Sequence, residues 1–319
     1  MEKTQLIPQK SPKSNAGKRM RNLGFEPVVF GTFNTIFMVC LVIVTLYPFL
    51  NTIAVSFNAG NDTIRGGIYL WPREWTIQNY KAVFASGTII PAFWISVART
   101  VISTILNLFL TTMLAYTLSR KEYVFRKQIT FIFVLTMYFN AGLIPNYFLI
   151  KDLHLINTFW VYVIPTMISA FNMIVIRTYI GGLHESLMES ARIDGAGEFK
   201  IFMKVVFPLC KPVLATIALF VAVGAWNSWF DAFIYTSSRQ HLSTLQYELM
   251  KLISSSMNAN SNASVANGAG VTAESAGSMV TPKSIRAAVT IVASVPILLV
   301  YPFMQKYFVV GMNVGSVKE

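Results

Sequence analysis

Side chains that could perform chemistry are sparse in this chain and lie far apart. The three histidines fall in three separate connections between apolar runs: His154, His184 and His241. Metal sites and histidine-activated nucleophiles need such groups close together, so this spacing indicates no metal ligands and no catalytic residues. Gly17-Lys18 is followed by Arg19 and lacks the earlier glycine of a phosphate-binding loop. We therefore expect neither an enzyme nor a protein that hydrolyses ATP itself.

Carboxylates are almost missing from the apolar runs, and Asp231 is the one in the fifth run. Carriers driven by proton or sodium gradients usually need ionisable groups near the middle of the membrane. The scarcity argues that this chain takes its energy from elsewhere. The two cysteines, Cys40 and Cys210, lie in or beside apolar runs and are expected to stay unpaired.

The composition is that of a membrane protein: 54% of the residues are hydrophobic, 13% are charged, and the mean hydropathy is +0.53. Soluble domains usually contain about 25% charged residues. The net charge of +12 could suggest a nucleic-acid partner. We expect none, because most of the basic residues flank apolar runs on one side of the membrane.

Six apolar runs exceed the about 20 residues that cross a bilayer as a helix. They cover 28–55, 90–118, 129–150, 155–180, 213–235 and 287–310. The far end of the third run, from Asn140 to Pro145, looks irregular because it contains glycine and proline. Lys and Arg are more frequent on the side of the N-terminal tail, which predicts two cytoplasmic termini. The first run is too long for a signal peptide, so its helix is expected to remain.

This pattern predicts an all-α membrane protein with six transmembrane helices. Residues 1–27 form a basic cytoplasmic tail, 28–310 the transmembrane domain, and 311–319 a cytoplasmic C-terminal tail. The domain includes a cytoplasmic connection at 184–208 and an extracytoplasmic one at 236–286. Within the latter we expect a short helix near 242–253 and a flexible insertion at 254–278, rich in Ser, Asn, Ala and Gly.

Arg99 lies inside the second apolar run. An arginine within a span is rare, and a functional role is the default hypothesis. The alternative is that it lies near the outer end and extends its guanidinium to the interface.

The connection at 184–208 is predicted to contain two short helices. The first covers 185–194, with Leu187 and Ala191 on one face, and Gly195 suits a left-handed cap. The second extends to 206, and Pro208 then redirects the chain. Such a helix can insert into a groove on a partner protein or lie on the lipid surface, and its physical properties favour neither.

The same connection resembles the EAA loop of ABC-importer permeases, which couples them to their ATPase subunits. The matching positions are Glu189, Ser190, Ala191, Asp194, Gly195 and Pro208. The sequence departs from the family pattern at Ser190, Val205 and Phe207, each a conservative change. The resemblance implies that the first helix docks into a cleft of the ATPase subunit.

The resemblance extends over nearly the whole chain from about residue 30. Trp226-Asn227-Ser228-Trp229-Phe230 is similar to a stretch of sugar permeases, and 142–147 resembles the subgroup that moves complex oligosaccharides. The C-terminal ending at 307–312 resembles maltose-type permeases. The resemblance implies the type I importer permease fold in the bacterial cytoplasmic membrane. It also implies a second homologous permease, two ATPase subunits that bind ATP and Mg, and an extracytoplasmic solute-binding protein that delivers the oligosaccharide.

Candidate substrate contacts cluster in the fifth run. Aromatic faces and amide or carboxylate groups suit sugar rings and hydroxyls. The candidates along the path are Trp226, Asn227, Trp229, Asp231 and Asn140. Two alternatives remain for them: an aromatic belt at the interface, or hydrogen bonds to neighbouring helices. Tyr247, in the long outer connection, is the candidate contact to the binding protein, unless that connection is a passive insertion.

Two other classes of protein compete with the importer subunit. A secondary carrier working alone is disfavoured by the scarcity of carboxylates and by the coupling loop. A membrane scaffold or sensor without transport is the other alternative.

Overall fold

The computed structural model describes residues 25–85, 87–266 and 280–316. Every regular element in these ranges is helical, and the bridged pair Asn58 and Trp75 belongs to no strand. The chain divides into two units, Met1–Asn51 and Thr52–Glu319. Nearly all of the predicted N-terminal tail and the last residues of the C-terminal tail lie outside the described ranges.

Three helices in the described ranges are long and apolar enough to cross a membrane. They are α1 (Phe25–Ser56), α4 (Ile89–Ser119) and the apolar part of α14 (Pro282–Ser316). Most of α1 belongs to the first unit. Two bent helix pairs raise the number of possible spans to five.

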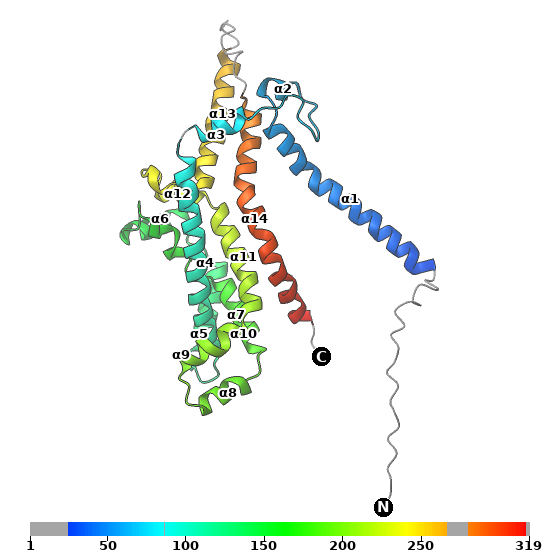
Figure 1. Cartoon of the computed structure of the whole chain (residues 1–319). Helices are drawn as coiled ribbons and strands as arrows, with labels where there is room; N and C mark the ends of the chain where they lie inside the picture. The colour runs from blue at the N-terminus through cyan, green and yellow to red at the C-terminus, as the bar shows by residue number, and fades with distance from the viewer. Residues whose placement is uncertain (1–24, 86, 267–279, 317–319) are drawn as a thin grey trace, which may run out of the picture. The chain divides into compact units, whose positions relative to one another are not determined.

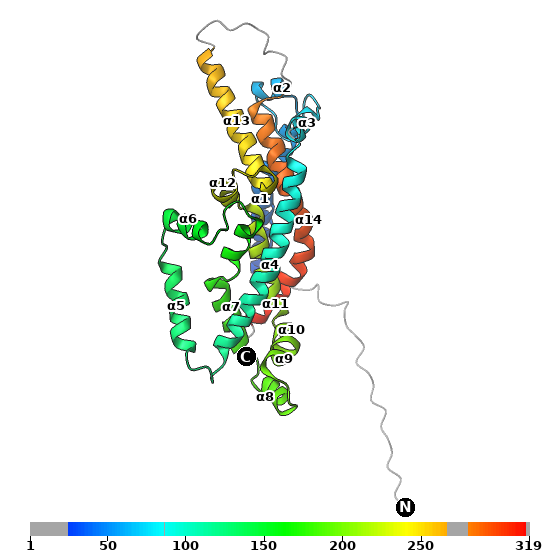
Figure 2. The same ribbon diagram turned by 90° about the vertical axis from the view of Figure 1, so that its left-hand side faces the viewer.

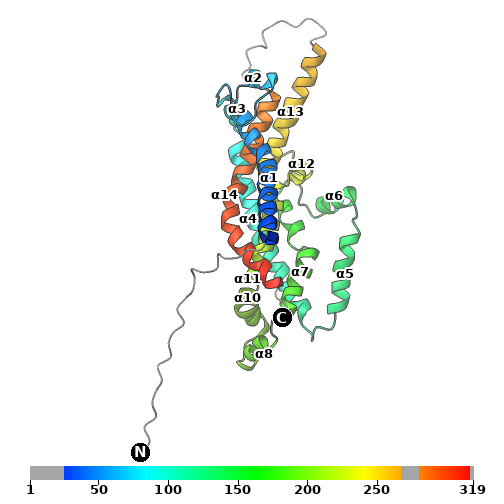
Figure 3. The same cartoon turned by 90° about the vertical axis from the view of Figure 1, so that its right-hand side faces the viewer.

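The second unit is a helix bundle built around α4, which contacts α7 (Ala170–Gly181), α11 (Lys211–Asn227) and α13 (Leu245–Ala266) (Figure 1). One end of the bundle carries α8 (Ser186–Ile193) and α9 (Glu198–Ile201). The opposite end carries α2 (Gly60–Arg65), α3 (Gln78–Phe84) and α13, as the two side views confirm (Figures 2 and 3).

The third apolar run does not form the single helix expected over 129–150. It is divided into α5 (Arg126–Tyr138) and α6 (Leu143–Asp152), neither long enough to span alone. The break has a local cause. Gly142 adopts φ +89°, a left-handed conformation that interrupts a helix and that glycine adopts without strain. The irregularity expected at this end of the run is confirmed.

The fourth and fifth runs are also broken, where continuous helices over 155–180 and 213–235 were expected. The fourth consists of the 3₁₀ turns η1 (Phe159–Tyr162) and η2 (Ile164–Thr166), followed by α7 at an angle of 46°. Pro165 lacks the amide hydrogen that a continuous helix needs. In the fifth, α11 ends at Asn227 and α12 (Phe230–Tyr235) follows.

The long connection at 236–286 is more helical than predicted. After the 3₁₀ turn η4 (Gln240–Leu242), α13 runs for 22 residues to Ala266. The expectation of a flexible insertion from 254 is therefore wrong as far as Ala266. The physical reason is that the sequence contains no glycine or proline between 254 and 266. The rest of the predicted insertion, 267–278, lies outside the described residues.

Candidate functional site

The connection at 184–208 begins with α8, which ends at the predicted left-handed cap. Gly195 has φ +78°, its amide donates to the Arg192 carbonyl at 2.9 Å, and the Ala196 amide donates to the Ala191 carbonyl at 3.0 Å. These two bonds form a Schellman motif, which satisfies carbonyls that the helix end leaves unpaired. The sequence prediction for Gly195 is confirmed.

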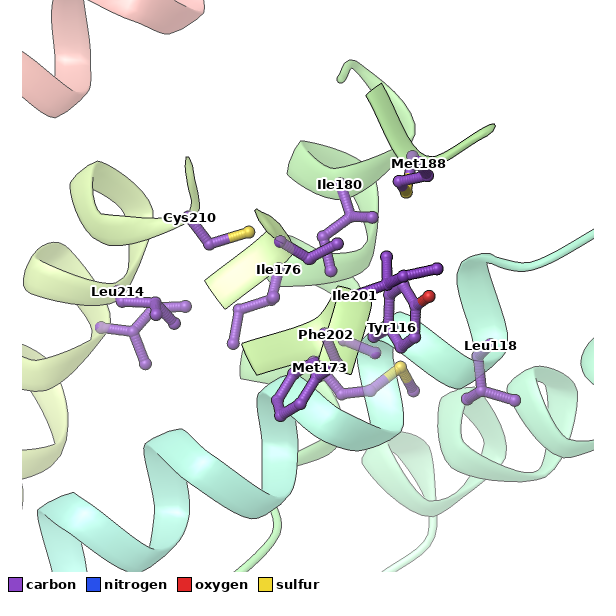
Figure 4. Packing of buried hydrophobic residues seen from close by; sticks show 13 residues of the cluster. Tyr116, Leu118, Met173, Ile176, Ile180, Met188, Ile201, Phe202, Cys210 and Leu214 are labelled. Carbon is purple, nitrogen blue, oxygen red and sulfur yellow. The ribbon is translucent and has the colours of Figure 1, made fainter. Parts of the chain in front are cut away.

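A buried hydrophobic cluster anchors this connection to α4, α7 and α11. Its members include Tyr116 from α4, Met173 from α7, and Ile201 and Phe202 from the connection itself (Figure 4). Met188 is the buried residue of α8, only 2% exposed, and Ala191 packs partly against the cluster. The cluster therefore fixes the position of the segment that carries α8.

The exposed side chains of α8 include two large apolar ones. Leu187 is 46% and Ile193 is 87% exposed. Leu187 and Ala191 are one helical turn apart in α8, as expected, and the side chain that this helix buries is that of Met188. Of the candidate coupling residues, those that α8 leaves exposed are Glu189, Ser190 and, at its end, Asp194.

The second helix was expected to end at 206, before Pro208, but it continues past this residue. The chain stays helical through α9, the π-helical turn η3 (Phe202–Val206) and α10 (Phe207–Leu209). Pro208 lies near the end of this helical segment, in α10 directly after the π-helical turn. The change of direction comes at Cys210, where the helical segment bends by 79° into α11. Cys210 is buried and, like Cys40, free, as predicted.

Charged groups link this connection to the end of α4 and the short segment that follows it. Lys121 Nζ donates to Glu185 Oε2 at 2.6 Å, and Arg192 Nη1 donates to Glu122 Oε1 at 3.3 Å. The hydrogen bond from Lys121 lowers the pKa of the Glu185 carboxyl. Glu198 receives a hydrogen bond from Arg192 Nε at 2.8 Å, and this contact raises the pKa of the Arg192 guanidinium.

A second polar site joins α4 to the break between α11 and α12. Arg99 is only 2% exposed, and its guanidinium forms an ion pair with the Asp231 carboxylate. Arg99 Nη1 donates to the Ser228 carbonyl at 3.0 Å, and Ser228 Oγ donates to Asp231 Oδ2 at 2.8 Å. The Tyr162 ring lies 4.7 Å from the guanidinium carbon. Arg99 therefore binds the Ser228 carbonyl and the Asp231 carboxylate at a helix break. The alternative that it extends to the interface is wrong.

The candidate path residues of the fifth run do not share one environment. Trp226 is buried, and its Nε1 donates to the Ala293 carbonyl of α14 at 3.2 Å. Asn227 is exposed, and its Oδ1 accepts from Gln246 Nε2 at 3.3 Å. Trp229 is partly buried and packs beside α12. Asp231 is also partly buried, with 33% of its side chain exposed.

The two remaining candidates lie in different places. Asn140 is exposed, and its Oδ1 accepts the Gly142 amide at 2.9 Å, so it stabilises the turn before α6. Tyr247 is 9% exposed at the base of α13, with Lys251 Nζ 4.2 Å from its ring centre. Its exposed edge is small, and most of its surface packs inside the bundle.

Sequence reasoning missed the partners of two charged side chains. Arg99 and Asp231 are both ionic groups in apolar runs, and their opposite charges are the signal that could have paired them. The contact between Glu198 and α4 had no comparable signal. No group of three potential metal ligands occurs within the described ranges.

Comparison with known proteins assigns the family. Residues 89–314 match the model of the binding-protein-dependent transport system inner membrane component, and the chain belongs to this family. It is 34% identical over 301 residues to a polygalacturonan/rhamnogalacturonan transport system permease protein of Bacillus subtilis, covering 94% of this chain and 100% of that one. It is 28% identical over 292 residues to an arabinooligosaccharides transport system permease protein of Halalkalibacterium halodurans, covering 89% and 95%.

A solved structure has the same fold. It is a bacterial ABC transporter involved in the import of the acidic polysaccharide alginate, with a TM-score of 0.76 and 29% identity. The match covers 89% of this chain and 98% of that one. The fold is thus that of an ABC-importer permease, the family is one of transporter subunits rather than enzymes, and the predicted resemblance is confirmed.

Proposed function

We propose that this chain is a membrane-spanning subunit of an ATP-driven importer and forms part of the path for an oligosaccharide. The observation that carries the proposal is α8, fixed by the Gly195 cap and by Met188, with Glu189 and Ser190 exposed at one end of the bundle. A short helix held rigidly at its base and open on its outer face suits a groove on a partner. The sugar transporters among its relatives support the substrate class.

The proposed arrangement in the bacterial cytoplasmic membrane has six spans, multi-pass, with both termini in the cytoplasm. The domain boundaries are those of the sequence: 1–27, 28–310 and 311–319. Broken spans are compatible with this topology, because non-helical backbone is tolerated at membrane depth where it is buried in protein or lines a cavity. The α8 end then faces the cytoplasm and the α13 end faces outward.

The proposed partners complete the machine. A second homologous permease shares the translocation path, two ATPase subunits bind ATP and Mg and receive α8, and an extracytoplasmic binding protein delivers the oligosaccharide at the α13 end. In this arrangement Asn227 and Asp231 are the best placed candidate path residues. Tyr247 packs at the base of α13 and supports this helix where it faces the binding protein.

Uptake by whole cells tests the proposal. A strain lacking this chain is compared with the restored strain on a panel of neutral and acidic oligosaccharides. We expect at least one sugar to be taken up only by the restored strain, and uptake to persist when an uncoupler is added while ATP is maintained. Uptake that stops with the uncoupler at unchanged ATP would instead indicate a secondary carrier.

A further inference from the structure

Glu198 links two parts of the chain through its two carboxylate oxygens. Its Oε2 accepts a hydrogen bond from Tyr116 Oη, at the end of α4, at 2.5 Å. Its Oε1 accepts from Arg192 Nε, in the last turn of α8, at 2.8 Å. One side chain at the start of α9 thus connects the exposed helix α8 to α4, around which the bundle is built. Glu198 is not part of the EAA-type pattern that identifies the loop.

The Tyr116 end of this link is rigid. Tyr116 is 4% exposed, its ring lies 5.6 Å from the Phe202 ring, and the Arg120 guanidinium carbon lies 5.0 Å from it on α4's end. The carboxyl and its other donor are more open, since the side chains of Glu198 and Arg192 are 56% and 32% exposed. The buried Tyr116 hydroxyl therefore fixes the position of the more exposed Glu198 carboxylate. Ion pairs between two exposed side chains fix position poorly.

The surroundings allow the link to move. A hollow of about 470 Å³ opens beside it. Its lining includes Tyr116, Arg120, Glu122, Tyr123, Arg192 and Glu198. Two nitrogens of the Arg120 guanidinium, Nε and Nη1, are buried without an acceptor among the described residues.

We propose that Glu198 is a positioning residue that transmits movement of α8 to α4 during transport. Force applied to α8 by the ATPase passes from Arg192 through the Glu198 carboxylate to the Tyr116 hydroxyl. The proposal rests on the proposed function and adds to it a residue outside the recognised loop motif. The competing interpretation is that Glu198 merely stabilises the first turn of α9, where an acidic side chain is favoured.

The test uses the complete importer in proteoliposomes, with both permeases, the ATPase subunits and the binding protein. The variants are Tyr116→Phe, which removes one hydroxyl, and Glu198→Gln, which keeps the shape and removes the charge. Lys121→Gln is the matched control, because it breaks the ion pair between Lys121 and Glu185, which also links the connection at 184–208 to the end of α4. The side chains of that pair are 71% and 42% exposed. The readout is the amount of sugar imported per ATP hydrolysed.

We expect both link variants to import about tenfold less sugar per ATP, the change that loss of a hydrogen bond to a charged group produces in an equilibrium. Their yield of assembled complex should equal that of the wild type, and the control should import at the wild-type ratio. An unchanged ratio in both link variants overturns the proposal, as does an equal loss in the control. A purely stabilising role would lower the yield or thermal stability and leave the ratio intact.

Charge exchange provides a second measurement if either variant assembles poorly. Arg192→Glu and Glu198→Arg should each lower the ratio, and the double variant should recover most of it. No recovery in a well-assembled double variant counts against the link. The proposed function fails separately, if the wild-type importer itself shows no ATP-dependent uptake.

Discussion

Removal of the Asp231 carboxylate should destabilise the protein more than removal of its partner Arg99. In Asp231→Ala the guanidinium stays buried, because only 3% of the Arg99 side chain is exposed. Breaking a buried pair from one side costs about 3–5 kcal/mol. The lower end, about 3 kcal/mol, applies here, since the Ser228 carbonyl and the Tyr162 ring still face the guanidinium.

Removal of Arg99 costs less, because the unpaired group that it leaves is the partly exposed Asp231 carboxylate. In Arg99→Met the carboxylate is already 33% exposed and keeps the hydrogen bond from Ser228, so water can replace the arginine. We expect a loss of about 1.5 kcal/mol, that of one hydrogen bond to a charged group. The double variant Arg99→Met/Asp231→Leu leaves no unpaired charge and should be close to the wild type.

The assay is the unfolding rate of the purified complex in detergent containing increasing amounts of SDS. A loss of about 3 kcal/mol from the folded state alone accelerates unfolding about a hundredfold, and about 1.5 kcal/mol about tenfold. An Arg99→Met complex that unfolds as fast as Asp231→Ala, or faster, would refute the reasoning. So would a double variant less stable than both single variants.

Four further substitutions test the remaining sites. Gly195→Val places a β-branched side chain at φ +78°, and we expect membrane insertion to be normal while sugar-stimulated ATPase activity is lost; normal stimulation would contradict the role of the cap. Trp226→Phe removes a hydrogen bond to α14 and should cost about 1 kcal/mol of stability without changing sugar preference, whereas Asn227→Ala, at an exposed position, should raise the KM for sugar. A changed sugar preference in Trp226→Phe would show that Trp226 contacts the sugar and is not only structural. Tyr247→Ala empties a buried place at the base of α13 and should weaken stimulation of the ATPase by binding protein; unchanged stimulation would exclude a role for this residue.

Local rules in the sequence predicted some features because their causes are local. The cap at Gly195 follows from one residue type and its position, and the irregular end of the third run follows from Gly142. The family followed from the spacing of Glu189, Gly195 and Pro208. These are features that a short stretch of sequence determines by itself.

Other features depended on tertiary contacts and were predicted wrongly or missed. Pro165 is a local signal for the break in the fourth run, although the apolar length of that run favours a continuous span. The fifth run contains no proline, and its break at Ser228 is stabilised by Arg99 of the neighbouring helix α4. The chain before Cys210 stays helical past the expected proline boundary because Phe202 and Val206 are buried in the cluster. Leu187 and Met188 are adjacent and both apolar, so only the packing decides which of them is buried.

The two polar sites, Arg99 with Asp231 and Tyr116 with Glu198, are both attached to α4. Arg99 and Tyr116 both belong to α4, and their separation of 17 residues corresponds to roughly 26 Å along the helix axis. One holds the break that carries the partly exposed Asp231, and the other holds the connection that presents α8. We expect a displacement at the Tyr116 end to reach the Arg99 end, because one continuous helix contains both residues. Under the proposed function, α4 is therefore the element that joins the ATPase contact at α8 to the sugar path at Asp231.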